Sequence, residues 1–323
     1  MKLKFASPVV VIILIAALLV VVVVLVQNAN RTALDSARRV ECANNLHNLA
    51  LGMHEYHDVH RKLPPFSVNT EEHFGSWALM VLPYMEASAV FRQFDLHSPA
   101  NSPENISLLA DYRSPYWQCP TRRTNATYSF EGSDLFSSSP SVHKYLPTDY
   151  VAAHSSSDVV WSHEANGMIV NLRSNPSQGD FPGSVTNFAS CVDGTSNTAL
   201  IGEKHMHPDW LGQPEATHGW LELPLAMAAD SPAFIRVGGD RTAHGAVSLA
   251  PRADFSTADD PNAVHMFGSW HEGLTLFANA DASVRVLRNA ISPEVLGYYI
   301  QRNDRQRLLE DSEGVLQSSG TAR

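Results

Sequence analysis

The chain has 323 residues, of which 44% are hydrophobic and 17% charged, and its net charge is −10. The apolar content argues against a disordered chain, and the charged content lies below the roughly one quarter usual in soluble domains. A protein that binds nucleic acid needs a basic face to neutralise phosphates, so the acidic balance speaks against nucleic acid as a partner.

The N-terminal segment predicts a membrane span. No charged residue occurs from Phe5 to Val26, and residues 9–26 are an unbroken apolar run of 18. A helix of this length crosses roughly 30 Å of hydrocarbon. Lys2 and Lys4 precede it, and the positive-inside bias keeps such a tail in the cytoplasm. We therefore expect a cytoplasmic tail at 1–4, a transmembrane helix at 5–26 and an extracytoplasmic remainder, which makes a single-pass protein of the cell membrane.

A cleaved secretory signal is the alternative for this segment. Such signals usually have an apolar region of about 7–15 residues that ends in a small-x-small cleavage site. Here the run is longer, and Gln27-Asn28-Ala29 is a poor match to that site. These two features favour an anchor that stays in place.

A helical pattern continues beyond the apolar run, over residues 27–62. Apolar residues recur at three- and four-residue steps, namely Leu34, Ala37, Val40, Ala43, Leu46, Leu49, Met53 and Tyr56. Charged and polar residues fill much of the remainder, including Asp35, Arg38, Arg39, Glu41 and Asn45. The pattern predicts an amphipathic extension that packs on a sheet and ends before Pro64-Pro65.

After the prolines the sequence consists of short apolar segments separated by Gly, Pro, Ser and Asn, a pattern typical of strands and turns. We predict strands at 168–172, 199–202, 274–278 and 283–287. The last two form a β-hairpin around the turn residues Asn279–Ala282. Helices are predicted at 76–94, with a break near Pro83, and at 292–302, where Ser292 and Pro293 suit an N-cap and first turn.

These elements predict an α+β fold, with a long N-terminal helix, half transmembrane and half amphipathic, packed on an antiparallel β-sheet. The mostly β ectodomain is expected at 63–302. Residues 303–323 are polar and are expected to form a frayed C-terminal tail with no role of its own.

Several sequence segments, in order along most of the chain, resemble one family. They are Cys42-Ala43-Asn44-Asn45-Leu46, His54-Glu55-Tyr56-His57, Leu63-Pro64-Pro65, Ser76-Trp77, Leu82-Pro83-Tyr84-Met85-Glu86, Cys119-Pro120, Thr148-Asp149-Tyr150-Val151, Asp193 to Thr198, Gly202-Glu203, Phe267 to His271 and Asp281 to Val284. This set resembles the prepilin-like DUF1559 proteins of planctomycete-type bacteria, known by a C-terminal H-x9-DG motif. The resemblance implies a pilin-like architecture related to type II secretion pseudopilins, and it implies no activity.

The chain departs from that family at two informative places. Prepilins carry a glycine for peptidase cleavage and a glutamate within the apolar segment, and both are missing from Lys4–Val9. A carboxylate in lipid is costly and is kept for use, so its absence predicts that the filament-assembly role is lost or altered. In the H-x9-DG motif Ala282 replaces the glycine, which predicts that a turn with positive φ is disfavoured there.

The three cysteines, Cys42, Cys119 and Cys191, form no Cys-x-x-Cys pair. One disulfide with a spare thiol and three buried free thiols are both compatible with their spacing. The sequence does not choose which pair would form.

The histidines suggest a divalent metal as the only candidate cofactor. Glu203, His205 and His207 alternate, and on a strand they would project from one face as a three-ligand set. An ordinary loop is the favoured alternative. His54, His57 and His60 gather at the expected helix end, where cations suit the helix dipole.

Two motif segments have both a structural and a chemical interpretation. Asp193-Gly194-Thr195-Ser196-Asn197 is typical of a tight turn and also offers oxygen ligands for calcium, and the turn is favoured. His271 and Asp281 suggest an imidazole oriented by a carboxylate across the hairpin, with a structural hydrogen bond as the favoured role.

No nucleotide-binding or hydrolase signature is present, which favours a protein that is not an enzyme. We expect a membrane-anchored, pseudopilin-like envelope protein that acts through protein contacts in a secretion or cell-surface assembly. Its partners would be the lipid bilayer and other envelope proteins, with self-association as an option. The rival function is a metal-dependent or carbohydrate-binding ectodomain that uses Glu203, His205, His207, His271 or a stacking surface of tryptophans.

Overall fold

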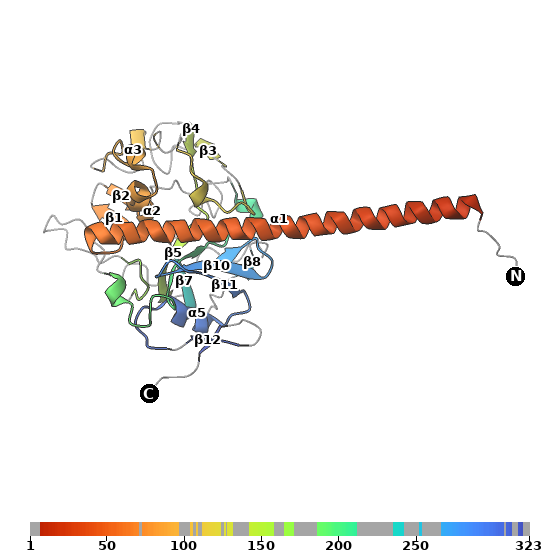
Figure 1. Cartoon of the computed structure of the whole chain (residues 1–323). Helices are drawn as coiled ribbons and strands as arrows, with labels where there is room; N and C mark the ends of the chain where they lie inside the picture. Colours follow the sequence, from red (N-terminus) through yellow and green to blue (C-terminus); the bar gives the residue numbers. More distant parts are fainter. Residues whose placement is uncertain are drawn as a thin grey trace.

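Helix α1 (Pro8–His60) is a single helix of 53 residues that enters the body of the protein and projects from it at its N-terminal end (Figure 1). Ser7 caps its start, and Arg61 ends it in the left-handed conformation at φ 57°. The computed structural model describes residues 7–70, 73–96, 104–105, 108, 112–123, 126, 128–131, 142–157, 165–170, 186–211, 235–241, 252–253, 266–306, 308–311 and 316–318.

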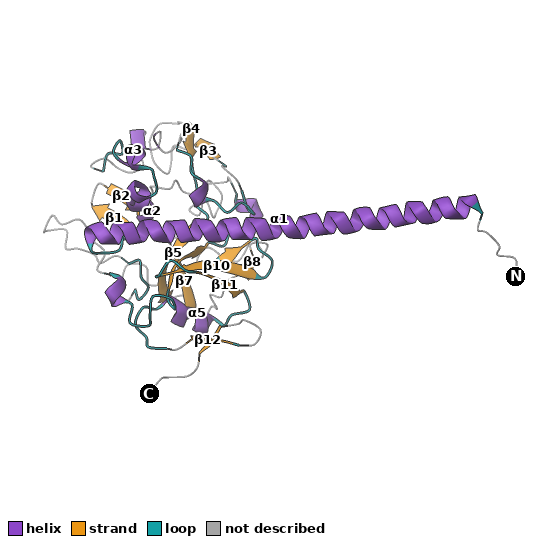
Figure 2. Ribbon diagram, in the orientation of Figure 1, coloured by secondary structure: helices purple, strands orange, loops and turns teal. Residues whose placement is uncertain are grey.

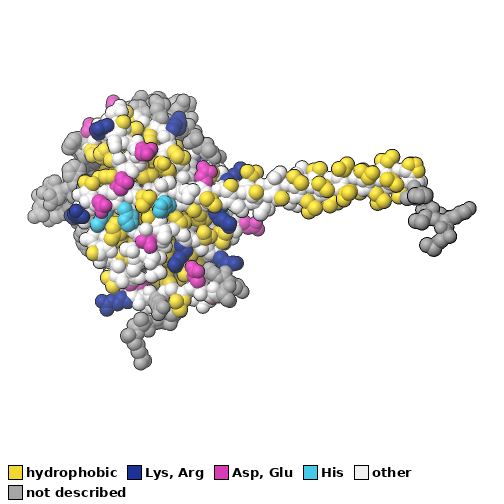
Figure 3. Space-filling view, in the orientation of Figure 1, with side chains coloured by type: hydrophobic (Ala, Val, Ile, Leu, Met, Phe, Trp, Pro, Cys, Tyr) yellow, Lys and Arg dark blue, Asp and Glu magenta, His cyan; other side chains and the backbone are white. Residues whose placement is uncertain are grey.

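The first part of α1 is long and apolar enough to cross a membrane, and none of its most apolar window is buried in the body. Figure 3 shows apolar side chains over the outer part of the projecting helix, and polar and charged side chains nearer the body. The buried residues of α1 begin only at Cys42 and are Cys42, Asn45, Leu46, Leu49, Ala50, Gly52 and Met53.

The prediction that residues 27–62 pack along their whole length is wrong for residues 27–41, which are exposed. Leu34 and Val40 are 56% and 60% exposed. Each three-residue step from Leu34 rotates the side chain about 60° away from the previous one, so these residues do not share a face. The positions that lie on the same helix face as Cys42, one and two turns before it, are Arg38 and Asp35. Both are charged, and charged side chains are rarely buried in a core.

The body is built on a five-stranded sheet of order β11-β10-β6-β5-β7. Its strands are β5 (Tyr150–Ser157), β6 (Ala199–Glu203), β7 (Ile235–Arg241), β10 (Leu274–Asn279) and β11 (Val284–Arg288). Neighbouring strands are antiparallel, except that β5 and β7 are parallel. The fold class is therefore α+β, as predicted.

Three of the four predicted strands and the hairpin are confirmed, since β6, β10 and β11 lie at the expected residues. The strand predicted at 168–172 is wrong for Met168–Val170, which form a buried bend instead, and residues 171–172 lie outside the described part. A short apolar run bounded by turn residues fits a buried loop as well as a strand, so the pattern alone could not decide.

The sheet separates two layers of helix (Figure 2). Alternate strand residues face opposite sides, so on β10 Leu276 and Ala278 join the core that contains α1. Phe277 faces the other way and packs on Tyr299 of α5 (Pro293–Ile300). Ser292 caps α5 as predicted, although the helix ends at Ile300 and not at residue 302.

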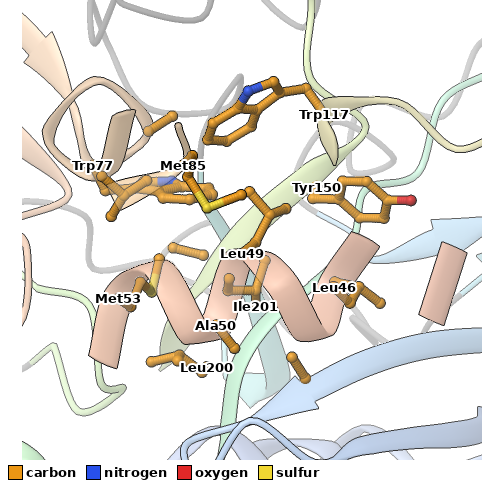
Figure 4. Packing of buried hydrophobic residues seen from close by; sticks show 14 of the residues in the cluster. Leu46, Leu49, Ala50, Met53, Trp77, Met85, Trp117, Tyr150, Leu200 and Ile201 are labelled. Carbon is orange, nitrogen blue, oxygen red and sulfur yellow. The ribbon is translucent and has the colours of Figure 1, made fainter. Parts of the chain in front are cut away.

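The segment before β5 covers the side of α1 away from the sheet (Figure 1). It contains β1 (Ser67–Thr70), β2 (His73–Ser76), α2 (Trp77–Val81), η1 (Leu82–Tyr84), α3 (Ser88–Phe91), η2 (Pro115–Trp117), β3 (Tyr128–Glu131) and β4 (Val142–Tyr145). The helix predicted at 76–94 is thus broken near Pro83, as expected. Figure 4 shows Trp77, Met85 and Trp117 on one side of α1 and Leu200 on the other, so the helix is enclosed by two layers of core.

The β10–β11 turn docks on α1 through two histidines. Ring nitrogens of His47 and His54 lie 2.7 and 2.9 Å from the carbonyl oxygens of Ala282 and Ala280. Ala282 nevertheless has φ 66°, so the turn keeps the positive φ that alanine disfavours. The cost of roughly 1–2 kcal/mol for a left-handed residue is offset by burial of its methyl group and by the histidine contact.

The remaining short elements are η4 (Phe188–Ser190), η5 (Pro208–Trp210), β8 (Arg252–Ala253), β9 (Gly268–Ser269), β12 (Leu308–Glu310) and β13 (Leu316–Ser318). The last two form a hairpin, and Leu316 is buried in the core beside α5. The prediction of a frayed tail at 303–323 is therefore wrong for this hairpin, because a single buried leucine and ladder bonds order an otherwise polar segment.

Leu49 and Leu51 of α1 offer a matched test of the buried face. Leu49 is fully buried and Leu51 is 41% exposed, although they lie two residues apart. We expect Leu49→Ala to lower the free energy of unfolding by about 2–5 kcal/mol and Leu51→Ala to change it by less than about 0.5 kcal/mol. Urea unfolding of the detergent-solubilised chain, followed by tryptophan fluorescence, measures both. Equal losses would contradict this packing of α1.

Candidate functional site

Four side chains from distant parts of the sequence converge between α1 and the sheet. We call them the Cys-Glu-His cluster: Cys42, Cys119, Glu203 and His271. All four are buried, and their ligand-type atoms lie within 4.8 Å of one another. Cys42 comes from α1, Cys119 follows η2, Glu203 ends β6, and His271 precedes β10. Within the described residues this is the group in which metal-type donors gather.

Cys42 and Cys119 form a disulfide that fastens α1 to the body, with their Cα atoms 5.3 Å apart. Cys191 is the free cysteine, and its thiol contacts the Thr198 hydroxyl at 3.2 Å. Burial raises the pKa of the Cys191 thiol, so it is a weak nucleophile.

His271 is the centre of the cluster. Its Nε2 lies 3.7 Å from Cys119 Sγ and 3.6 Å from Glu203 Oε1, and its Nδ1 lies 3.5 Å from the Thr121 hydroxyl. Backbone bonds fix the residue, because its carbonyl accepts from the amide of Leu274 where β10 begins. Gly273, at φ 67°, makes the tight turn between them.

Glu203 is held by the neighbouring strand. Its Oε2 accepts a hydrogen bond of 2.9 Å from the backbone amide of Leu276 on β10. The other carboxylate oxygen therefore faces His271. The side chain is fully buried, and a buried carboxylate requires such partners.

An ion-pair network adjoins the cluster. The fully buried Asp149 accepts from the guanidinium groups of Arg122 and Arg123 and, at 2.9 Å, from the amide of Cys119. Burial acts to raise the pKa of Asp149, but the charges of Arg123 and Arg122 outweigh it and lower that pKa to about 2. Asp149 is thus ionised, and it positions the backbone that carries Cys119.

A polar side chain of α1 completes the surroundings. Asn45, expected on the polar face, is buried. Its side-chain amide donates hydrogen bonds to the carbonyl of Gln118 at 3.1 Å and to the hydroxyl of Tyr150 at 3.4 Å. Burial and the nearby charge of Glu203 raise the pKa of Tyr150 well above its usual value. This tyrosine is therefore a neutral hydrogen-bonding group.

The metal set predicted from alternation does not assemble as a unit. Strand β6 ends at Glu203, and His205 and His207 lie beyond it. His205 and His207 instead pack on the ring of Trp210, each with centroids 5.7 Å apart. Only Glu203 of the three enters the cluster.

The Asp193–Asn197 segment meets the turn between β10 and β11, away from the cluster. Asp193, which begins the predicted Asp193–Asn197 turn, accepts hydrogen bonds of 2.8 and 2.6 Å from the amides of Asp304 and Arg305. The carbonyl of Thr195 accepts from the amide of Asp281. The segment is thus a structural turn that joins the hairpin to the C-terminal strands.

His271 and Asp281 do not form the expected pair. They lie beyond opposite ends of β10, and the Asp281 carboxylate instead accepts from the amide and hydroxyl of Ser283. A six-residue strand keeps the two side chains about 20 Å apart. The histidine belongs to the cluster and the aspartate to the turn.

A stacking surface of tryptophans is not seen among the described residues. Trp77, Trp117 and Trp210 are buried, and Trp270 is half-buried with its indole bonded to the carbonyl of Met206. Trp161 and Trp220 lie outside the described part of the chain. The three buried tryptophans therefore offer no exposed stacking face.

Sequence analysis missed the cluster as a group, although a signal was present. Its members all stand in segments that carry the family resemblance: Cys42-Ala43-Asn44, Cys119-Pro120, Gly202-Glu203 and Phe267 to His271. The segment Thr148–Val151 supplies Asp149 beside them. Their occurrence in the segments that carry the resemblance was the available indication.

Comparison with known proteins gives one match. The model of a family described as "Protein of unknown function (DUF1559)" matches residues 31–294. No curated protein matches the chain, and no solved structure matches it.

Asp149 provides a test of the network beside the cluster. Asp149→Asn would leave the buried guanidinium groups of Arg122 and Arg123 without their countercharge, which should lower the free energy of unfolding by about 3–5 kcal/mol. Asp209→Asn is the control, because that side chain is 79% exposed and should change stability by less than about 0.5 kcal/mol. Urea unfolding compares the two. If Asp149→Asn leaves the free energy of unfolding unchanged, the network does not support the fold.

Proposed function

The chain belongs to the DUF1559 family, and from this premise we propose that it is a membrane-anchored, non-enzymatic envelope protein. Its ectodomain would lie outside the cytoplasm and act through protein contacts in a secretion or cell-surface assembly of the pseudopilin kind. The observation that carries the proposal is the continuity of α1, which joins an exposed apolar segment to the ectodomain core without a break.

The apolar segment fits lipid and not another part of this chain. Residues 9–26 are exposed on every side of the helix. Exposure of so large an apolar surface to water is unfavourable, so the segment needs an apolar environment around it. A bilayer covers such a surface on every side, and the segment has the length to span it.

The polar stretch 27–41 then holds the body away from the bilayer. These residues are exposed and carry both signs of charge, including the Asp35–Arg38 pair at 4.0 Å. At 1.5 Å per residue the stretch spans roughly 22 Å, which exceeds the headgroup layer. The ectodomain is thereby presented to other proteins and does not lie on the lipid.

One side of α1 remains open along the ectodomain and is the surface we assign to protein contacts. Asn44, His47, Leu51, Glu55 and Asp58 are exposed at three- and four-residue steps. Figure 3 shows histidine and acidic side chains along this side of the body. A polar ridge with an apolar residue at its centre suits a partner helix in a transient assembly.

Protease accessibility tests the orientation. With a tag at each end of the chain, protease added to cells whose outer layers are permeabilised should remove the C-terminal tag and spare the N-terminal one, because only the latter lies in the cytoplasm. Immunoblots of the membrane fraction give the result. Recovery of the full chain in the soluble fraction, or digestion only after the inner membrane is broken, would overturn the proposal.

Crosslinking in living cells tests the protein contacts. A photoreactive residue at Leu51, on the open side of α1, should give adducts that contain a second polypeptide, because its side chain faces outward. Leu309, exposed on β12 at the other side of the body, is the matched position and should give fewer adducts. Absence of adducts at Leu51, with the protein present at normal level in the membrane, would contradict the assigned surface.

A further inference from the structure

We propose that the Cys-Glu-His cluster binds one zinc ion when its two cysteines are reduced, so that one site holds either a disulfide or a metal. Two thiolates, one imidazole and one carboxylate are donors that zinc accepts in structural sites. The inference concerns residues to which the proposed function gives no role beyond fastening α1.

The distances suit a tetrahedral ion. With zinc–ligand bonds of about 2.0–2.3 Å, neighbouring donor atoms of a tetrahedron lie roughly 3.3–3.8 Å apart. His271 Nε2 lies 3.7 Å from Cys119 Sγ and 3.6 Å from Glu203 Oε1. The full set lies within 4.8 Å, and cleavage of the disulfide frees the two sulfur atoms to move apart to the separation that an ion requires.

The outer contacts orient the donors as metal sites require. A ligating histidine needs its second ring nitrogen on an acceptor, and His271 Nδ1 faces the Thr121 hydroxyl at 3.5 Å. The Leu276 amide holds Glu203 Oε2, which leaves Oε1 toward the cluster. The Cys119 backbone is held by Asp149. Each of these three donors is therefore supported by a partner outside the cluster.

The surrounding charge favours an anionic complex. Zinc with two thiolates and a carboxylate has a net charge of −1. The neighbouring buried side chains include three cations and one anion, so the surroundings are positive. The cations are Arg122, Arg123 and Lys204, and the anion is Asp149. Four donors complete a tetrahedral set and their burial excludes water, which is typical of a structural site and not of a catalytic one.

The change of state is a balanced exchange. A dithiol reductant gives two electrons and two protons to the Cys42–Cys119 bond, which becomes two thiols, and the reductant becomes a disulfide. A zinc ion then displaces the two thiol protons and binds both sulfur atoms, with lone pairs from His271 and Glu203. In both states α1 stays fastened to the ectodomain, by a covalent bond or by the ion.

The test uses the full-length chain in detergent, with Co²⁺ as a spectroscopic probe and Zn²⁺ as its competitor. After reduction with a phosphine and removal of that reagent under inert gas, the protein should take up one equivalent of Co²⁺. The complex should show thiolate-to-cobalt charge transfer and the strong visible bands of tetrahedral cobalt, and Zn²⁺ should displace it. The disulfide form should give neither signal.

Variants assign the ligands. His271→Ala and Glu203→Gln should each weaken Co²⁺ binding at least tenfold, whereas Cys191→Ala and His207→Ala, outside the cluster, should bind as the parent does. Circular dichroism of each reduced protein, with and without Zn²⁺, reports its fold. The proposal fails if the reduced parent gives no cobalt–thiolate signal, if it unfolds with Zn²⁺ present, or if His271→Ala and Glu203→Gln both bind like the parent.

Discussion

The fold depends on the burial of one face of α1 between two layers of core. From Cys42 to Met53 this helix contacts the sheet on one side and the Trp77 and Trp117 layer on the other, so neither layer is complete without it. The Cys42–Cys119 bond fixes the helix axially, and His47 and His54 fix the hairpin turn against it. Helix α1 is therefore the central element of the folded body.

This arrangement also explains why the buried polar groups collect where they do. Cys119, Asp149 and Glu203 stand at the ends of elements, where backbone groups lack partners of their own. The carboxylates satisfy amides of Cys119 and Leu276, and the arginines compensate the charge. The same hydrogen bonds thus support the fold and position the donor atoms.

Local patterns in the sequence predicted the elements whose signals are local. The hairpin of β10 and β11 follows from alternation and turn residues, and α5 follows from Ser292 and Pro293. The local pattern placed Asn45 on the polar face. Its buried position depends on Gln118 and Tyr150, which are far away in sequence and so leave no local signal. Ala282 is a similar case, since its left-handed conformation is held by contacts with α1. The cluster required the tertiary fold, because four separate segments supply its donors.

Because α1 is one continuous helix, a tilt at one end moves the other end. Neither glycine nor proline occurs between Val9 and Leu51, and kinks in helices arise mostly at such residues. The helix is roughly 80 Å long, so a tilt of about 10° within the membrane moves its far end by roughly 14 Å. A bilayer that thickens or thins alters this tilt, and the body must swing with it. In the proposed anchored state, membrane thickness would therefore set the angle at which the body faces its neighbours.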